Sequence, residues 1–183
     1  MRVITGKARG RRLETPVGDD VRPTTEVVKE AVFSVLQFRI EGRSFLDLFA
    51  GSGQMGIEAL SRGASKAVFV DADKRSAALV KKNLDSTGLT AHAVVHNKDS
   101  IAFLKSCGEK FDIAFLDPPY KTGTLQRALE NIERVMNKGG LILCEHPADE
   151  VLDEEIGDFV VKKQYRYGKI RITAYSHKEV EGL

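Results

Sequence analysis

The segment LDLFAGSGQMG, residues 46–56, runs from an apolar stretch through a glycine-rich turn into the start of a helical pattern. Gly51, Gly53 and Gly56 have the spacing GxGxxG, after a predicted strand and before a predicted helix, which is typical of a nucleotide-binding turn. Glycine lets a ligand approach the backbone, and the N-terminus of the following helix offers free N–H groups. The segment therefore predicts a strand–turn–helix unit that binds a nucleoside cofactor.

From Ser44 onward, short apolar runs alternate with helical patterns, which is typical of an α/β protein with a parallel sheet. The expected strands are 44–48, 66–70, 91–96, 111–116 and 141–145. The expected helices are 54–62, 73–86, a short helix after Asp99, and 124–136, which should end at Gly139-Gly140. Alternating runs at 159–161 and 170–175 predict an antiparallel hairpin at the sheet edge.

A basic segment and an amphipathic helix are expected ahead of the sheet. Residues 3–5 and 12–14, separated by glycines, predict a small basic β-hairpin, and residues 25–38 predict a helix that covers the sheet. The length of 183 residues, 42% of them hydrophobic, fits one compact domain over residues 1–183. Residues 1–24 would be an N-terminal extension of that domain.

Basic residues gather in two places although the net charge is only +2. Residues 1–12 contain five Lys or Arg and no acid, including Arg9, Arg11 and Arg12, and residues 162–171 also contain five and no acid. Such segments are typical of a surface that binds a phosphate backbone. The alternative is a pair of solvated strand faces, and charge alone leaves both open.

Several classes of protein are disfavoured by composition. Cys107 and Cys144 lack CxxC spacing, so neither a metal site nor a disulfide framework is expected. No apolar run approaches the roughly 18 residues of a membrane span, and the first residues lack the apolar core of a signal peptide. A soluble cytoplasmic protein is expected, and its small size and charged surface favour a monomer.

Acidic residues at the ends of successive strands suggest how the cofactor is held. Asp71 lies 20 residues after Gly51, where a carboxylate binds ribose hydroxyls, so a dinucleotide is one interpretation. Asp47 favours S-adenosylmethionine instead, because a carboxylate there would accept from an ammonium group and repel a pyrophosphate. Asp99, with Ser100 beside it, would accept from the adenine amine. The alternatives are a buried structural acid at Asp47 and a helix N-cap at Asp99.

The tetrapeptide Asp117-Pro118-Pro119-Tyr120 follows the strand predicted at 111–116. Two prolines form a stiff segment that cannot continue the strand. The Asp117 carboxylate and the Pro118 carbonyl would bind the N–H groups of an exocyclic base amine and direct its lone pair at a methyl donor. Tyr120 would stack on the base. A simple turn with an Asp cap is the alternative, and whether Asp117 also accepts the product proton is left open.

Together these residues resemble the RsmD family. The resemblance is carried by residues 46–56 with 60–64, by 111–112 leading to 116–120, and by shorter landmarks near both ends of the chain: Gly6, Gly10-Arg11, Leu13, Arg22-Pro23-Thr24-Thr25 and Tyr167-Gly168. It implies a class I, Rossmann-like methyltransferase fold whose seven-stranded sheet has its last strand antiparallel. It further implies transfer from S-adenosylmethionine to a guanine N2 in small-subunit (16S) ribosomal RNA, so that ribosomal RNA or the small subunit is the partner.

The same resemblance implies roles for individual residues. Those implied in cofactor contacts are Asp47, Phe49, Gly51, Gly53, Asp71 and Asp99. Residues 117–120 carry the chemistry, and Arg22 and Thr24 border the active site. Asp71 stands where Glu is commoner in the family, and Gln54-Met55 replaces a small apolar pair, so the ribose contact and the shape of the turn are less closely matched.

Other functions remain open on sequence grounds. DPPY suits an adenine-N6 or cytosine-N4 methyltransferase on DNA or RNA equally well. A ribosome-assembly factor, in which RNA binding matters more than catalysis, belongs to a different class of function. A dehydrogenase is the most distant alternative, because this chain has little length left for a substrate domain.

Overall fold

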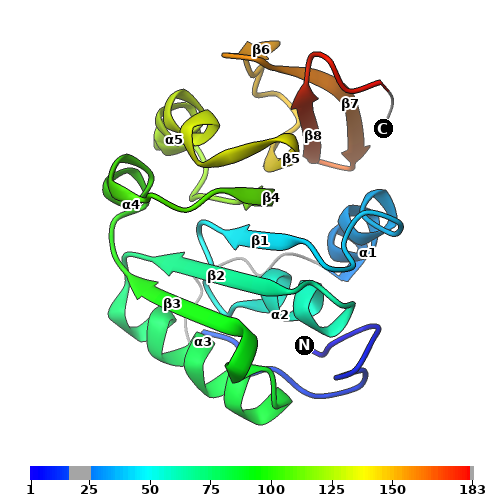
Figure 1. Ribbon diagram of the computed structural model, residues 1–183, viewed down its shortest axis with the longest axis vertical. Coiled ribbons are helices and arrows are strands. Elements are labelled where there is room, and N and C mark those ends of the chain that lie inside the picture. The colour runs from blue at the N-terminus through cyan, green and yellow to red at the C-terminus, as the bar shows by residue number, and fades with distance from the viewer. Residues whose placement is uncertain (17–25, 182–183) are drawn as a thin grey trace.

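One mixed sheet forms the centre of the computed structural model, which describes residues 1–16 and 26–181. Its strands are β1 (Ser44–Asp47), β2 (Lys66–Asp71), β3 (Ala93–Asn97), β4 (Phe111–Leu116), β5 (Met136–Pro147), β6 (Glu155–Ile156), β7 (Phe159–Tyr167) and β8 (Ile170–His177). Their order across the sheet is β3-β2-β1-β4-β5-β8-β7-β6 (Figure 1). Strands β1 to β5 are parallel, whereas β8 runs antiparallel to β5. The carboxyl ends of β1 to β5 therefore meet at one edge.

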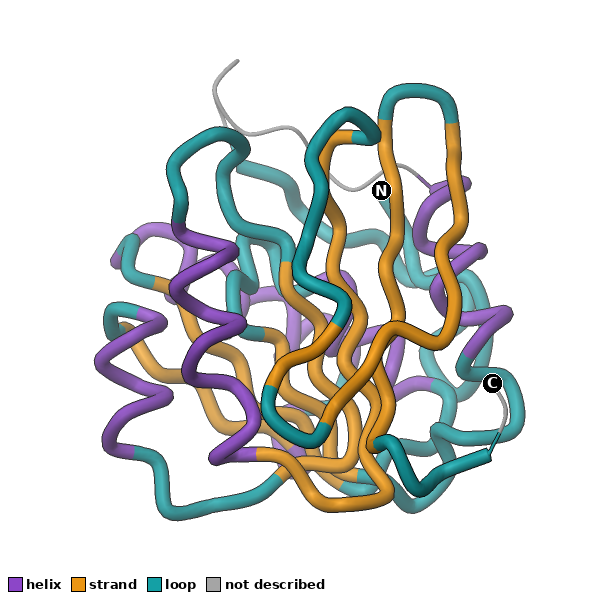
Figure 2. The backbone as a smooth tube through the Cα atoms, turned by 90° about the horizontal axis from the view of Figure 1, so that it is seen from above, coloured by secondary structure: helices purple, strands orange, loops and turns teal. Residues whose placement is uncertain are grey.

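Helices lie on both sides of the sheet (Figure 2). They are α1 (Glu26–Val35), α2 (Gln54–Ser61), α3 (Lys74–Thr87), α4 (Ser100–Ser106) and α5 (Thr124–Ile132), with short 3-10 turns η1 (Thr90–His92) and η2 (Glu133–Val135). The Asp73 carboxylate accepts from the Arg75 N–H at 2.9 Å to cap α3, which ends at Gly88 in a left-handed conformation. Both ends agree with the predicted helix.

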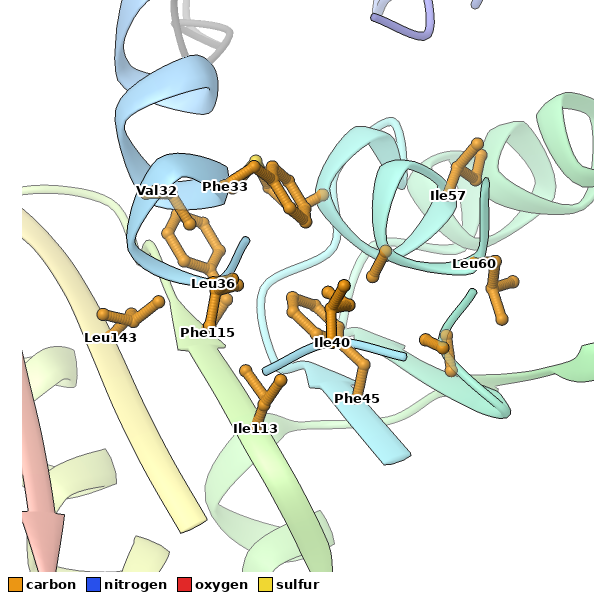
Figure 3. Packing of buried hydrophobic residues seen from close by; sticks show 14 of the residues in the cluster. Val32, Phe33, Leu36, Ile40, Phe45, Ile57, Leu60, Ile113, Phe115 and Leu143 are labelled. Atoms are coloured by element: carbon orange, nitrogen blue, oxygen red, sulfur yellow. The ribbon is translucent and has the colours of Figure 1, made fainter. Parts of the chain in front are cut away.

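Two hydrophobic cores separate the faces of the sheet. Successive strand residues point to opposite faces, so Phe45 joins the core under α1, α2 and α3, whereas Leu46 joins the core under α4 and α5. Figure 3 shows the first core, where α1 residues such as Phe33 and Leu36 lie over the sheet. The Phe33 and Phe45 rings stack with centroids 6.5 Å apart. The α/β fold with helices on both faces of a mostly parallel sheet is confirmed.

The predicted number of seven strands is wrong: the described chain has eight in its sheet. The additional strand, β6, has two residues, and Ile156 pairs with Phe159 at the start of β7 across a turn at Gly157. Two residues are too few to show alternation, and they lie in the acidic stretch 145–158, so no strand signal is present in the sequence. The antiparallel edge hairpin of β7 and β8 is confirmed.

The boundary between α5 and β5 also differs from the prediction. The helix ends at Ile132, and β5 already begins at Met136, so Gly139 and Gly140 lie inside the strand. A Cβ at Gly140 would lie 3.0 Å from the Asp112 carbonyl oxygen. Glycine thus permits β5 to come close to β4 where the register between the two strands shifts, a long-range reason that helix-ending rules do not consider.

The basic N-terminal segment turns back on itself with one antiparallel bridge, between Arg2 and Arg12, in place of the predicted hairpin ladder. Its backbone groups bind helix α2 instead. Both oxygens of the buried Glu58 carboxylate accept backbone N–H groups, from Ile4 at 2.8 Å and from Thr5 at 2.9 Å. Three backbone hydrogen bonds join the two arms of the segment around that bridge, and Glu58, more than fifty residues away in sequence, binds the first arm.

Further contacts fix the same segment on α2. The Ser61 hydroxyl accepts from the Ala8 N–H and donates to the Thr5 carbonyl. A Cβ on Gly6 would lie 1.8 Å from the Ser61 carbonyl oxygen, and φ at Gly6 is +88°, so only glycine fits. The N-terminal segment is therefore held as a rigid part of the surface.

Glu58 also belongs to a buried group of charges. Arg62 donates to its carboxylate at 2.8 Å, and the Lys29 Nζ lies 3.8 Å away, with Lys29 and Glu58 both fully buried. Lys29 also donates to the Arg2 carbonyl at 2.7 Å. Burial lowers the pKa of Lys29, and the Glu58 carboxylate opposes that shift. Helix α1, helix α2 and the N-terminal segment therefore meet at one carboxylate.

Replacing Glu58 with alanine should lower the free energy of unfolding by about 3–5 kcal/mol, because Lys29 would remain buried without its carboxylate. Urea unfolding followed by circular dichroism measures the change. Glu130→Ala, at an exposed site of α5, is the control and should change stability by less than about 0.5 kcal/mol. Equal small losses in the two variants would show that the buried group does not hold the segment.

Candidate active site

The glycine-rich turn follows β1 at the carboxyl edge of the sheet and leads into α2. Gly51 and Gly53 have φ of +55° and +79°, which other residues rarely adopt. A Cβ at Gly56 would lie 2.3 Å from the Phe69 ring, so glycine there allows α2 to sit directly on β2. Nothing lies within 4 Å of a Cβ built on Gly51. The start of α2 therefore packs tightly against β2, whereas the backbone at Gly51 has free space beside it.

Asp47 lies behind the turn and is 1% exposed. Its carboxylate accepts from the Gly56 N–H at 3.0 Å, satisfying one of the unpaired donors in the first turn of α2. Burial raises the pKa of Asp47 to about 7, while the bond from Gly56 lowers it and nearby Asp71 raises it further. This bond agrees with the alternative interpretation of Asp47, in which it is a buried structural acid.

Asp71 at the end of β2 connects two loops at the sheet edge. One carboxylate oxygen accepts from the Gly51 N–H at 2.9 Å, and the other accepts from the Asp73 N–H at 2.8 Å. The Asn97 side chain donates to the carbonyls of Asp71 and Ala72, which fixes the turn after β2 from the neighbouring strand. The carboxylate is thus held in place beside the glycine turn, with acceptor capacity remaining on each oxygen.

Asp99 and Ser100 lie where β3 is followed by α4. The Asp99 carboxylate accepts from the Ala102 N–H at 2.8 Å, so it is the N-cap of α4. Asp99 is exposed and Ser100 is buried, and both line the same cleft as Asp71. The N-cap interpretation of Asp99 is confirmed, and capping uses only part of what its two oxygens can accept.

The segment 117–120 leaves the sheet directly after β4. The Tyr120 hydroxyl donates to Glu145 Oε1 on β5 at 2.9 Å. The Thr122 hydroxyl donates to the Pro119 carbonyl at 2.9 Å and closes a turn. Within this turn Lys121 has φ of +60°, an unusual value for a residue other than glycine. The prolines, this turn and the Tyr120 bond together fix the segment.

One cleft of about 700 Å³ brings these parts together. Of the predicted residues, those that line it are Phe49, Gly51, Asp71, Asp99, Ser100, Asp117, Pro118, Pro119 and Tyr120. A second cleft, of about 840 Å³, lies between the N-terminal segment, α1 and the end of α2, and none of the predicted cofactor or catalytic residues line it. The chemistry-bearing side chains thus converge at the carboxyl edge, where open α/β sheets bind ligands.

Other predicted residues lie elsewhere. Asp47, which is buried behind the turn, and Gly53, which is part of the turn, do not line the cleft. Arg9, Arg11 and Arg12 are exposed on the N-terminal segment, away from the cleft lining. Arg22 and Thr24 lie outside the described residues.

Sequence reasoning did not assign to the site six residues that line the cleft: Leu48, Ala72, Asp73, Ser76, Thr124 and Glu145. Glu145 is 2% exposed and directly follows the apolar run 141–144 in β5. That pattern, an acid directly after Leu141-Ile142-Leu143-Cys144 in the strand beside the catalytic segment, was the available signal. Ser76 and Thr124 are ordinary helix residues and carry no comparable signal.

Two features are absent from the described residues. No group of three His, Cys, Asp or Glu side chains there is arranged to hold a metal ion. In the same part of the chain, no helix combines the length and apolar character that crossing a bilayer requires.

The fold and the cleft together define the class: this is the α/β fold of the S-adenosylmethionine-dependent methyltransferases. A solved structure described as "Putative methyltransferase yhhF from Escherichia coli" superposes with a TM-score of 0.85 at 31% identity, and the match covers 97% of both chains. The family described as "Conserved hypothetical protein 95" matches residues 1–176. The chain belongs to this family, which confirms the resemblance to the RsmD methyltransferases.

Two relatives show how far the similarity extends. The YlbH protein of Bacillus subtilis is 39% identical over 183 residues, which span 97% of this chain and all of the relative. "Ribosomal RNA small subunit methyltransferase D" of Haemophilus influenzae is 41% identical over 157 residues, which span 83% of this chain and 81% of the relative. The similarity therefore includes the glycine turn and the catalytic segment within one continuous match.

Asp47 makes stability depend on pH in a defined direction. Its pKa rises from 3.8 to about 7 on folding, so between these values the folded protein holds a proton that the unfolded chain has lost. The contribution of Asp47 is therefore most favourable below pH 4 and is lost as pH rises toward 7. Asp47→Asn keeps an acceptor for Gly56 but has no such proton.

The unfolding free energy of Asp47→Asn minus that of the original protein should be roughly 2–4 kcal/mol larger at pH 8 than at pH 4.5. Urea unfolding of both ligand-free proteins at the two pH values measures this difference, in which the other titrating groups cancel. A difference that does not change with pH would show that Asp47 is ionised throughout.

Proposed function

We propose that the protein transfers a methyl group from S-adenosylmethionine to the exocyclic N2 amine of a guanine in small-subunit ribosomal RNA. The observation that carries the proposal is the single cleft in which Gly51, Asp71 and Asp99 meet the segment 117–120. The printed name of the Haemophilus relative supports the RNA substrate. A nucleotide-binding turn alone does not require a DPPY segment at the same edge of the sheet, and a DPPY segment alone does not require a nucleotide-binding turn there.

The cofactor half of the cleft fits S-adenosylmethionine. The open side of Gly51 allows a ligand to approach the turn, and the fixed Asp71 carboxylate can accept from two ribose hydroxyls. Asp99 can accept from the adenine amine while it caps α4. When bound, the cofactor supplies a methyl group on a positively charged sulfur.

Asp47 takes an indirect role in this arrangement. It is buried and bonded to the Gly56 N–H, so it shapes the turn from behind. An ammonium group of the cofactor near the turn would favour the ionised carboxylate and so lower the pKa of Asp47 from about 7. Cofactor binding and the protonation of Asp47 are then linked.

The transfer half of the cleft is built for a base amine. The lone pair of such an amine is delocalised into the ring, so the enzyme must localise it before transfer. Asp117 and the Pro118 carbonyl each accept one N–H, which directs the lone pair toward the methyl group. Their positions are fixed by the rigid segment between β4 and α5, so little reorganisation is needed during the reaction.

The target base must leave its stack to reach this cleft. A paired base cannot present its amine to Asp117 at the floor of a cleft, so an unstacked nucleotide is required. The Tyr120 ring, held through its hydroxyl by Glu145, offers a face on which the base stacks. A loop or an end of the RNA supplies such a base at the lowest free-energy cost.

Basic side chains are exposed on two surfaces, the N-terminal segment and the turn between β7 and β8. The N-terminal segment is fixed on α2 and presents Arg9, Arg11 and Arg12 to solvent. The turn between β7 and β8 lies at the same edge as the carboxyl end of β5, since Ile170 pairs with Pro147. Basic side chains on both surfaces would bind phosphates and orient the RNA across the cleft.

RNA affinity should fall steeply with salt because each phosphate contact releases counterions. Each of the variants Arg9→Ala, Arg11→Ala and Arg12→Ala should reduce the slope of log affinity against log salt by about 0.7–0.9. Fluorescence anisotropy with labelled RNA from 50 to 300 mM KCl measures the slope. Lys105→Ala, an exposed residue of α4, is the control and should leave it unchanged. If all four variants have the same slope, the N-terminal segment is not part of the surface that binds RNA.

Asp117→Ala should retain cofactor affinity within about threefold and lose at least about 100-fold in turnover, because Asp117 is assigned to the amine and not to the cofactor. Isothermal titration with S-adenosylmethionine and a single-turnover assay measure the two effects separately. A collapse of cofactor affinity in this variant would contradict the assigned role.

The proposed reaction is tested most directly by the identity of the product. Small ribosomal subunits from a strain lacking the gene are incubated with the protein and methyl-labelled cofactor, and the labelled nucleoside is identified by mass spectrometry. N2-methylguanosine is expected. Label in N6-methyladenosine or N4-methylcytidine would keep the Asp117 chemistry and discard guanine, and cofactor binding without any label on RNA would favour an assembly role.

A further inference from the structure

Glu145 is an acid in the transfer half of the cleft that the mechanism above uses only to hold Tyr120. Leu116 pairs with Cys144 in the register of β4 and β5, so the next residues, Asp117 directly after β4 and Glu145 within β5, lie side by side. Adjacent strands are about 5 Å apart, which is the scale of a base edge. Glu145 lines the cleft, although its side chain is almost completely buried.

The three bases that carry exocyclic amines differ in what stands beside the amine. In guanine, N2 is flanked by the N1–H donor and by the N3 acceptor. In adenine, N6 is flanked by two acceptors, N1 and N7, and in cytosine, N4 is flanked by the N3 acceptor and a C–H group. Only guanine therefore offers a hydrogen-bond donor next to the amine that is methylated.

We infer that Glu145 is the residue that selects guanine, by accepting a hydrogen bond from N1–H while Asp117 and the Pro118 carbonyl hold the N2 amine. This inference rests on the proposed function. The two acids stand next to each other, as N1 and N2 do on the edge of guanine. The carboxylate of Glu145 accepts from Tyr120 with Oε1, and a carboxylate can accept from more than one donor.

Burial makes this selection strong. A carboxylate in a nearly dry site gains from a donor and is penalised by an acceptor, because water is not present to shield the repulsion. Adenine or cytosine in the same pose would place a ring nitrogen lone pair against Glu145. Close packing around Glu145, which is 2% exposed, limits rotation of its carboxylate, and the bond from Tyr120 adds to this restraint.

The test compares two substrates that carry the same amine. RNA with guanine at the target position is compared with RNA that has 2-aminopurine there, since 2-aminopurine keeps the N2 amine but has an acceptor at N1. For the original protein, kcat/KM should favour guanine by about 10- to 100-fold. Glu145→Gln, whose amide donates as well as accepts, should lower that ratio at least tenfold. Tyr120→Phe should reduce the rate on both substrates and preserve most of the ratio.

The outcomes separate the inference from the proposed function. If guanine is methylated but the original protein uses 2-aminopurine equally well, Glu145 does not select the base, whatever the variant does. If Glu145→Gln lowers kcat/KM on both substrates by the same factor, Glu145 only positions Tyr120 and the inference is overturned. If the original protein does not methylate guanine at all, the proposed function fails first and this inference fails with it.

Discussion

The parallel alignment of β1, β2, β3, β4 and β5 is the constraint on which the site depends. Because their carboxyl ends share one edge, residues that are more than twenty positions apart in sequence come within reach of one ligand. Asp71 is an example of such a residue, because its carboxylate accepts from the Gly51 N–H after β1 and from the Asp73 N–H before α3. Moving either strand by one residue would turn these side chains to the wrong face. The sheet register therefore sets the cofactor half of the cleft before any ligand arrives.

The two halves of the cleft use acids in different ways. Asp71 and Asp99 are partly committed to backbone N–H groups and retain acceptor capacity toward the cleft. Asp47 is buried behind the turn, where its raised pKa records the cost of ionisation without a cationic neighbour. In the transfer half, Glu145 is as buried as Asp47 but binds the hydroxyl of Tyr120. Acids of similar sequence context thus differ in function because their burial and partners differ.

The N-terminal segment shows how a basic surface is made rigid. Its two arms are joined by one bridge and a few backbone hydrogen bonds, and Glu58 and Ser61 on α2 bind its backbone from outside. A fixed array of arginines loses less conformational entropy on meeting RNA than a free tail would. The carboxylate that holds it is buried with Lys29, so the proposed RNA surface and the stability of the first core depend on the same side chain.

Local sequence determined much of the fold and most of the site. The glycine turn, the caps at Asp73 and Asp99, the prolines after β4 and the β7–β8 hairpin follow from short-range conformational preferences, so their positions were predicted correctly. Only the tertiary structure decided the rest, namely β6, the early start of β5, the docking of residues 1–14, the bond of Asp47 to Gly56 and the place of Glu145 beside Tyr120. Each of these depends on which distant groups become neighbours once water is excluded, and neither periodicity nor spacing along the chain contains that information.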